Sequence, residues 1–127
     1  MAYRLGSKSL GKLEGVHPDL VDVVKQAITI SEQDFSVGEG LRSVARQREL
    51  VDTGKSTTMN SRHLTGHAVD LFPYPVNWDW AYFYPIADAM KQAARHLHVE
   101  LEWGGDWKSF PDGPHFQLSW SQYPLDD

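Results

Sequence analysis

Apolar residues recur at helical spacing in the first quarter of the chain. Pro18 suits the first turn of a helix, and the positions that follow it at i, i+3, i+4, i+7 and i+8 are apolar. These positions are Leu20, Val23, Val24, Ala27 and Ile28. The pattern predicts a helix over residues 17–30 with one face buried in a core.

Two further stretches have helical character. Ser43 is a suitable N-cap for a second helix that ends at about Val51. Residues 79–97 predict a third helix, which has one apolar stripe made of Trp80, Phe83, Ala87, Met90, Ala94 and Leu97. Pro85 lies inside this stretch, so the third helix must either start later than residue 79 or contain a kink.

Short alternating or β-branched runs predict strands between and after these helices. Residues 34–43 read as a short strand and a turn, which puts Arg42 at the junction with the second helix. The run 67–72, HAVDLF, reads as a strand ended by Pro73. The runs 99–103 and 115–119 read as neighbouring strands joined by the loop 104–114. The order of elements predicts an α+β fold, a small antiparallel sheet packed with about three helices.

Composition narrows the class of protein. A chain of 127 residues with 41% hydrophobic content predicts one domain, over residues 1–127, with one core and one site. The formal charge of -5 argues against a surface that binds nucleic acid or anionic membrane. Because the chain has no cysteine, any metal ion must be held by histidine and carboxylate side chains.

The N-terminal residues 1–16 carry positive charge but lack the continuous apolar run of a secretory signal, and no later stretch is long enough to cross a bilayer. We therefore expect synthesis in the cytoplasm without a membrane anchor. A substrate outside the cell would require a separate means of release.

Asp70 raises the first question of chemistry, because the predicted strand puts it on an apolar face with Ala68 and Phe72. A buried carboxylate must be paired, hydrogen-bonded or bound to a cation. A structural ion pair with Arg62 or Arg42 and a metal ion are both open from this strand alone.

His63 and His67 lie on either side of Gly66 just before this strand. Their i, i+4 spacing would suit a metal pair on one helical face, but Gly66 and the β-branched run after it argue against a helix. If Gly66 allows a turn, His63 can approach Asp70, and this is the pair we favour. His67 then points to the other face of the strand, which indicates a structural or supporting role.

A hydrolytic zinc site needs three protein ligands and an open position. His115 begins the last strand directly after Pro114 and is the candidate for the third ligand. Asp112 precedes it by three residues, so a chain reversal would bring the two within about 7 Å, the reach of a general base. Taken alone, this segment would be an ordinary surface turn.

The sequence around these candidate residues resembles that of a known family. SRHLTGHAVD has the S-x-H-x-x-G-x-A-x-D pattern of the zinc peptidases that include D-alanyl-D-alanine carboxypeptidases, VanX- and VanY-type enzymes and phage L-alanyl-D-glutamate endopeptidases. The fixed positions are filled by Ser61, His63, Gly66, Ala68 and Asp70. Similarity to the phage endolysin branch extends over nearly the whole chain, through EGLRSVARQRELV to EWGGDWKSFPDGPHFQL.

This resemblance implies a Hedgehog/DD-peptidase-like fold, Zn²⁺ as cofactor and a set of roles. His63, Asp70 and His115 match the zinc ligands, and Asp112 matches the acidic residue that serves as general base. Arg42 matches an arginine that faces the substrate or the developing oxyanion, although an ion pair with Glu39 is its alternative. The implied function is that of a monomeric endolysin that hydrolyses the L-alanyl–D-glutamate bond of peptidoglycan stem peptides and reaches the cell wall with the help of a holin.

Two alternatives remain open at this point. The first is a D-alanyl-D-alanine carboxypeptidase or dipeptidase on the same site, and the second is a non-catalytic domain that binds wall peptides. Among the other residues, His17 and His96 suit structural roles at helix ends. The tryptophans could line a groove for peptide or sugar, but core and rim positions are commoner for them: Trp78, Trp80, Trp103 and Trp107.

Overall fold

A four-stranded antiparallel sheet forms the centre of the computed structural model, which describes residues 2–125. The strands are β1 (Phe35–Glu39), β2 (Ala68–Pro73), β3 (Leu101–Trp103) and β4 (His115–Leu118), in the order β1-β2-β4-β3. The predicted α+β class and the pairing of the last two strands are therefore confirmed.

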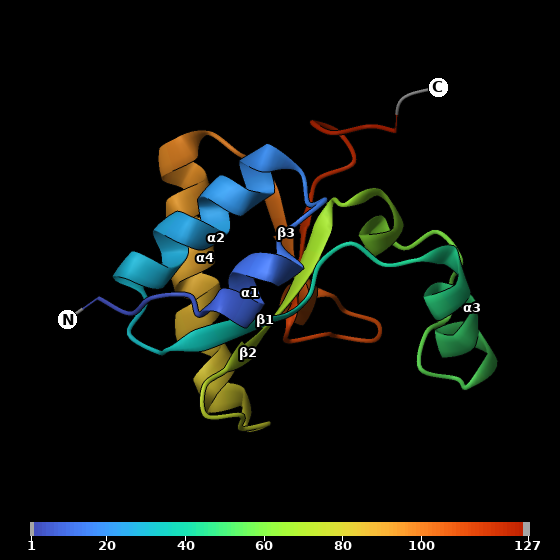
Figure 1. Cartoon of the computed structure of the whole chain (residues 1–127), viewed down its shortest axis with the longest axis horizontal. Helices are drawn as coiled ribbons and strands as arrows, with labels where there is room; N and C mark the ends of the chain where they lie inside the picture. The colour runs from blue at the N-terminus through green and yellow to red at the C-terminus, as the bar shows by residue number, and fades with distance from the viewer. Residues whose placement is uncertain (1, 126–127) are drawn as a thin grey trace.

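The helices are α1 (Ser7–Lys12), α2 (Pro18–Ile30), α3 (Val44–Asp52) and α4 (Phe83–Leu97). Single 3₁₀ turns occupy η1 (Arg62–Thr65), η2 (Trp80–Tyr82) and η3 (Gly104–Asp106). Figure 1 shows α2 and α4 side by side over one face of the sheet, whereas α3 stands apart on the right. Among the described residues, no helix is long and apolar enough to span a membrane.

The core lies between the α2–α4 pair and the sheet. The predicted apolar face of α2 is buried, since Leu20, Val23 and Val24 have no exposed surface. From the sheet, Val69 and Leu71 of β2 meet this layer and are equally buried. Alternation along β2 then turns Asp70 and Phe72 to the opposite face of the sheet.

The third helix starts later than residue 79, which resolves the alternatives raised by Pro85. Asp79 caps the η2 turn by accepting a hydrogen bond from the Ala81 N–H, and α4 begins at Phe83. Pro85 then falls in the first turn of α4, where its missing N–H removes no intrahelical hydrogen bond.

One helix, α1, has no counterpart in the sequence-based prediction. It has six residues and packs against β1, where the Val37 N–H donates a hydrogen bond of 2.9 Å to the Ser9 hydroxyl. Tertiary contact rather than apolar periodicity therefore stabilises this short helix.

Candidate metal centre

The open face of the sheet carries the polar residues of the site. Asp70 of β2 lies directly opposite His115 of β4 in the antiparallel register. Because side chains alternate along a strand, Gln117 projects from the same face as His115, while Phe116 and Leu118 point into the core. These strands therefore present a carboxylate, an imidazole and an amide side by side.

His63 reaches this face from the η1 turn rather than from the sheet. Ser61 caps the turn by accepting a hydrogen bond of 3.2 Å from the His63 N–H. Gly66 ends it with φ of 75°, in the left-handed region, and lies so close to the backbone of Gly15 that no side chain would fit. The tight reversal brings His63 Nε2 to 3.2 Å from Asp70 Oδ1, the approach expected of these two residues.

Three possible metal ligands converge in this way. One ligand atom from each of His63, Asp70 and His115 lies within 4.8 Å of the other two. All three side chains are largely withdrawn from solvent, and the two imidazole rings meet edge to face with centroids 5.1 Å apart. The group could hold a metal ion. His67 is not part of it, and its Nδ1 is 2.7 Å from the Thr65 hydroxyl instead.

Hydrogen bonds fix which nitrogen of each imidazole faces the centre. His63 Nδ1 lies 2.8 Å from the backbone oxygen of Gly40 and donates its proton there, so Nε2 faces Asp70. His115 has the opposite arrangement: Nε2 donates to Oε1 of Gln117 at 2.8 Å, and Nδ1 lies 3.4 Å from Asp70 Oδ1. An imidazole held through one nitrogen presents the lone pair of the other to a metal.

Gln117 was not among the predicted site residues. The signal for it was available, because it stands two positions after His115 on a strand and must therefore share its face. A glutamine is common on strands and surfaces, however, so this spacing has meaning only after His115 is known to be in the site.

Electrostatics favours an ionised Asp70. Burial raises the pKa of Asp70, but hydrogen bonds from His115 and His63, together with their charges, outweigh burial and bring the pKa far below its usual value. Burial lowers the pKa of His115, and its interactions with Asp70 and Gln117 more than compensate, so this pKa is raised. A cation that binds between Asp70 and the imidazoles must therefore displace the proton that these groups share.

Asp112 lies beside this group on a tight turn. The His115 N–H donates to the Asp112 backbone oxygen at 3.2 Å, and the Asp112 N–H donates to Gly104 at 2.9 Å. The predicted chain reversal before β4 is therefore present. Burial, and next the charge of Asp70, raise the pKa of the Asp112 carboxyl group, whose side chain lines the same groove as the three possible ligands.

Arg42 occupies the junction between β1 and α3. Its guanidinium group donates to both carboxylate oxygens of Glu39, at 2.7 and 2.8 Å, and to Gln47 at 2.7 Å. The ion pair with Glu39 that we considered for Arg42 therefore exists. Its Nη2 also lies 3.7 Å from Asp70 Oδ2, so the same arginine faces the centre.

Arg62 lies next to His63 in the sequence but points elsewhere. Its Nη2 donates to three backbone carbonyls near the C-terminus, those of Leu118, Ser119 and Tyr123. Its guanidinium group also stacks on the Trp120 ring at 3.9 Å. Of the two arginines considered as partners of Asp70, only Arg42 is near it in the structure.

The candidate centre opens into a groove on the side of the molecule that carries α3. Its polar lining includes Arg42, His63, Asp70, Asp112 and His115. Its aromatic lining is Phe72, Trp78, Trp107, Phe110 and Trp120. Two of the four tryptophans singled out earlier, Trp78 and Trp107, therefore line a groove, whereas Trp103 belongs to the core.

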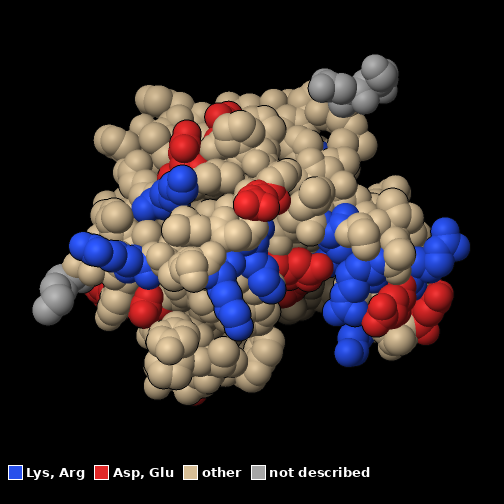
Figure 2. All heavy atoms as spheres, viewed as in Figure 1, with Lys and Arg blue, Asp and Glu red and all other residues tan. Residues whose placement is uncertain are grey.

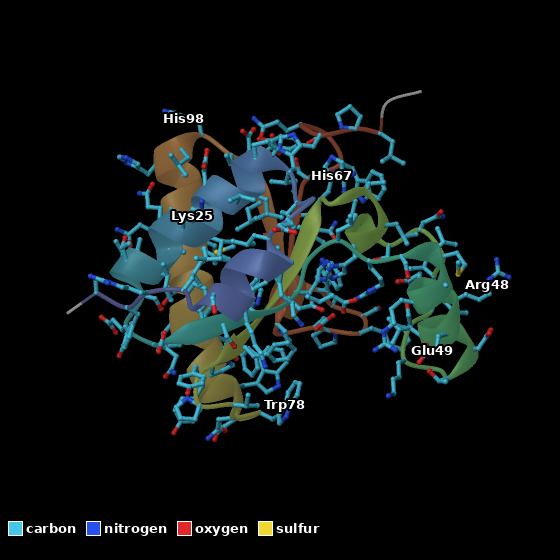
Figure 3. The ribbon with its side chains drawn as sticks, in the orientation of Figure 1. Lys25, Arg48, Glu49, His67, Trp78 and His98 are labelled. Atoms are coloured by element: carbon cyan, nitrogen blue, oxygen red, sulfur yellow. The ribbon has the colours of Figure 1, made fainter. Side chains whose placement is uncertain are left out.

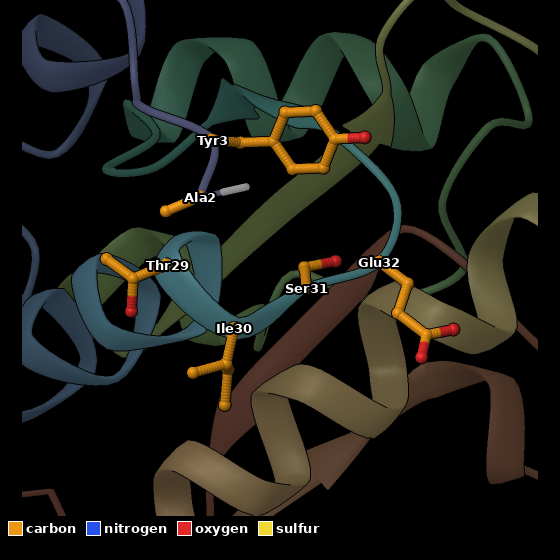
Figure 4. A pocket seen from close by; sticks show the side chains of 6 residues that line it. All are labelled: Ala2, Tyr3, Thr29, Ile30, Ser31 and Glu32. Atoms are coloured by element: carbon orange, nitrogen blue, oxygen red, sulfur yellow. The ribbon is translucent and has the colours of Figure 1, made fainter.

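Basic residues border the same groove. Arg46 of α3 and Lys55 of the loop after it line the groove, and Figure 2 shows Lys and Arg gathered with acidic residues over α3. A second hollow lies at the N-terminal end of the chain, beside the end of α2. Figure 4 shows its lining, in which Glu32 is the only carboxylate and no histidine is present. That hollow is therefore no candidate for a metal site.

His17 has the structural role expected of it. It caps α2, because its Nδ1 accepts a hydrogen bond of 3.1 Å from the Asp19 N–H. His96 lies at an exposed position in the last turn of α4. Neither side chain belongs to the group that could hold a metal.

Comparison with known proteins identifies the family. A family model described as phage L-alanyl-D-glutamate peptidase matches residues 1–118. The L-alanyl-D-glutamate peptidase of Escherichia phage T5 is 32% identical over 119 residues, which cover 88% of this chain and 87% of the phage protein. The peptidase of the same name from Listeria phage A118 is 30% identical over 124 residues, 94% of this chain and 44% of its own length.

A solved structure extends the agreement to three dimensions. The crystal structure of the Serratia marcescens L-Ala D-Glu endopeptidase ChiX superposes with a TM-score of 0.92 at 53% sequence identity, over 96% of this chain and 94% of that one. The resemblance stated from the SRHLTGHAVD motif is thus confirmed. The chain belongs to the phage L-alanyl-D-glutamate peptidase family.

Proposed function

We propose that the protein is a zinc-dependent endopeptidase that hydrolyses the L-alanyl–D-glutamate bond of peptidoglycan stem peptides. The observation that carries the proposal is the convergence of His63, Asp70 and His115 at the floor of a groove that Asp112 also lines. The family and the names of its relatives supply the bond and the substrate.

The donor set fits zinc. Two imidazoles and one carboxylate are a usual catalytic zinc set, which leaves a further position for water or substrate. The hydrogen bonds from His63 to Gly40 and from His115 to Gln117 hold the rings with their other nitrogens toward Asp70. Zinc bound there would supply Lewis acidity, which acidifies water toward a pKa of roughly 7 and polarises a carbonyl group.

Asp112 is the proposed general base. It takes a proton from the attacking water, whose oxygen forms a bond to the carbonyl carbon of L-alanine. When the carbon–nitrogen bond breaks, Asp112 delivers that proton to the amino group of D-glutamate. Burial raises the pKa of Asp112, which moves the carboxylate toward the basicity that such a proton transfer needs.

Arg42 is the proposed partner of the negative charge that develops on the carbonyl oxygen. Glu39 and Gln47 hold its guanidinium group from two sides, so the group is oriented before substrate arrives. Charge that is fixed in advance stabilises a transition state without reorganisation. The ion pair with Glu39 and the role toward substrate are therefore compatible.

The proposal extends to the domain organisation, the oligomeric state and the place where the protein acts. We infer a single catalytic domain over residues 1–127 that acts as a monomer, and the one buried core shared by α2, α4 and the four strands supports a single domain. Relatives named as phage peptidases support action on the cell wall. Release from the cytoplasm through a holin stays a prediction.

Product analysis tests the proposal directly. Gram-negative peptidoglycan is incubated with the zinc-loaded protein, with Asp112→Asn and with Asp88→Asn, a control at an exposed position of α4. Mass spectrometry should find peptides with a new amino terminus at D-glutamate for the wild type and Asp88→Asn, but not for Asp112→Asn. Release of D-alanine would instead indicate a carboxypeptidase. No cleavage by the zinc-loaded wild type would favour a non-catalytic binding domain.

A further inference from the structure

Aromatic rings continue outward from the groove, from the end of β2 through residues 74–82 to the first turn of α4. Phe72, Trp78, Trp80 and Tyr84 form what we call the aromatic shelf. Trp78 is 67% exposed, Tyr84 53% and Trp80 40%, which is unusual for side chains of this size. Contacts order the rings: Trp78 meets Phe72 with centroids 5.4 Å apart, and Trp80 meets Tyr84 at 6.1 Å.

The shelf and the groove form one surface. Phe72 and Trp78 line the groove together with Asp70 and Asp112. A side chain added at Gly113, next to Asp112, would lie 3.6 Å from Trp80, so the turn of the proposed base borders the shelf. A molecule that extends from the proposed reaction centre in this direction must therefore pass over these rings.

The two sides of the groove differ in charge. Lys55 lines it from the loop after α3, and Arg46 of α3 lines it while its guanidinium group pairs with Glu49 at 2.9 Å. Residues 74–84 contain no lysine or arginine, and Asp79 is their only charged residue. Figure 3 shows Trp78 below the sheet and α3, labelled at Arg48 and Glu49, to the right of it. The α3 side suits an anionic ligand, and the shelf suits a neutral one with apolar faces.

The substrate has the same asymmetry, an argument that rests on the proposed function. In peptidoglycan the L-alanine amino group is joined through a lactyl group to N-acetylmuramic acid, so the sugar begins roughly 7 Å before the bond that is cut, at about 3.5 Å for each unit. Beyond that bond the peptide carries several carboxylates. A neutral glycan strand therefore extends to one side of the reaction centre and an acidic peptide to the other.

We propose that the aromatic shelf binds the glycan strand of peptidoglycan next to the bond that is cut. The apolar C–H faces of the sugar rings stack on Trp78 and Trp80, whose rigid rings lose little conformational freedom on binding. The basic side of the groove then receives the peptide. The protein selects stem peptides that are still attached to glycan over free peptides.

Binding of peptide-free glycan tests the shelf without cleavage. Glycan strands stripped of stem peptides are titrated into the zinc-loaded full chain, and tryptophan fluorescence follows binding. Trp78→Ala should weaken binding at least tenfold and Trp78→Phe, which keeps a ring, by much less. Trp78 is exposed, so these variants should fold. Tyr3→Ala is the control, because Tyr3 is 38% exposed at the separate N-terminal hollow of Figure 4.

Cleavage rates separate this inference from the proposed function. The wild type should have a higher kcat/KM for a stem peptide that carries its disaccharide than for the free peptide, and Trp78→Ala should bring the ratio close to one. The inference is overturned if the wild type cleaves both substrates at equal kcat/KM and does not bind glycan at millimolar concentration. The proposed function would then still hold. Glycan binding that depends on Trp78 without any cleavage would support the shelf and overturn the proposed function. Binding to phosphatidylglycerol vesicles that depends on Trp78, without glycan binding, would assign the shelf to lipid and overturn the inference.

Discussion

Gln117 provides the sharpest test of how the candidate centre is held together. Its Oε1 accepts a hydrogen bond of 2.8 Å from His115 Nε2, and Gln117 itself is 7% exposed. The change Gln117→Leu keeps roughly the same volume and removes the acceptor. The His115 N–H then has no partner, and the ring is free to turn its nitrogens away from the site.

The expected loss follows from these contacts. A buried donor left without its acceptor costs about 1–3 kcal/mol. Removing a residue that orients a ligating histidine typically lowers metal affinity by about 10–100-fold, which corresponds to about 1.4–2.8 kcal/mol. The first range lowers the stability of the fold and the second lowers metal affinity, so we expect zinc to bind to Gln117→Leu about 10–100-fold more weakly than to the wild type.

The assay is a competition titration of zinc against a chromogenic chelator of known affinity. Gln117→Glu should retain most of the affinity, because it keeps an acceptor oxygen for the His115 N–H. Gln92→Leu, at an exposed position of α4, controls for the general effect of the substitution. Zinc affinity of Gln117→Leu within twofold of the wild type would refute the reasoning that Gln117 orients His115.

Three further predictions concern the charged groove, the metal and the C-terminal segment. Arg42→Lys should lower kcat about 10–1000-fold with little change in zinc affinity, because lysine cannot reproduce the two-pronged contact with Glu39. Steady-state kinetics measures kcat and the chelator titration measures zinc affinity, and an unchanged kcat would contradict the role of Arg42. Dialysis against a chelator should abolish cleavage, and activity that survives metal removal would exclude the proposed mechanism. Zinc at a hundred times its Kd should stabilise the fold by about 2.7 kcal/mol, which is measured as a higher Tm. Burial and the hydrogen bond to Asp19 raise the pKa of Tyr123 to about 12, so this contribution to stability is present below pH 10 and is lost as the pH rises toward 12. Tyr123→Phe should cost about 1 kcal/mol in urea unfolding at pH 8 and remove most of that alkaline loss, and an unchanged alkaline profile would argue against this hydrogen bond.

The main elements of the fold could be predicted because their patterns are local. The buried face of α2 follows from the spacing of Leu20, Val23 and Val24 alone. The short helix α1 escaped prediction because its six residues include Gly11 and lack an apolar stripe. Its stability comes from β1, through contacts such as that between Ser9 and Val37, and no window of sequence contains both partners.

In the candidate site, too, some contacts follow from the local sequence and others depend on the three-dimensional fold. The approach of His63 to Asp70 could be predicted because a single glycine turn separates them. That His115 lies opposite Asp70 depends on the register between β2 and β4, which the hydrophobic pattern alone does not give. His115 and Asp112 were predicted from their place at the start of the last strand, the family resemblance matched roles to them, and the structure then showed them at one groove. Gln117 could be recognised only after that register was known.

The two arginines show why neighbourhood in sequence is a poor guide to charge pairing. Arg62 is adjacent to His63, yet the η1 turn directs its side chain away from Asp70 toward the C-terminal carbonyls. Arg42 is remote in sequence from Asp70, yet the β1–β2 register, which pairs Glu39 with Asp70, brings it within 3.7 Å. An ion pair and a metal site for Asp70 were therefore not exclusive alternatives. One carboxylate oxygen faces Arg42 and the other faces both histidines, so a cation can bind on the imidazole side while the arginine remains in place.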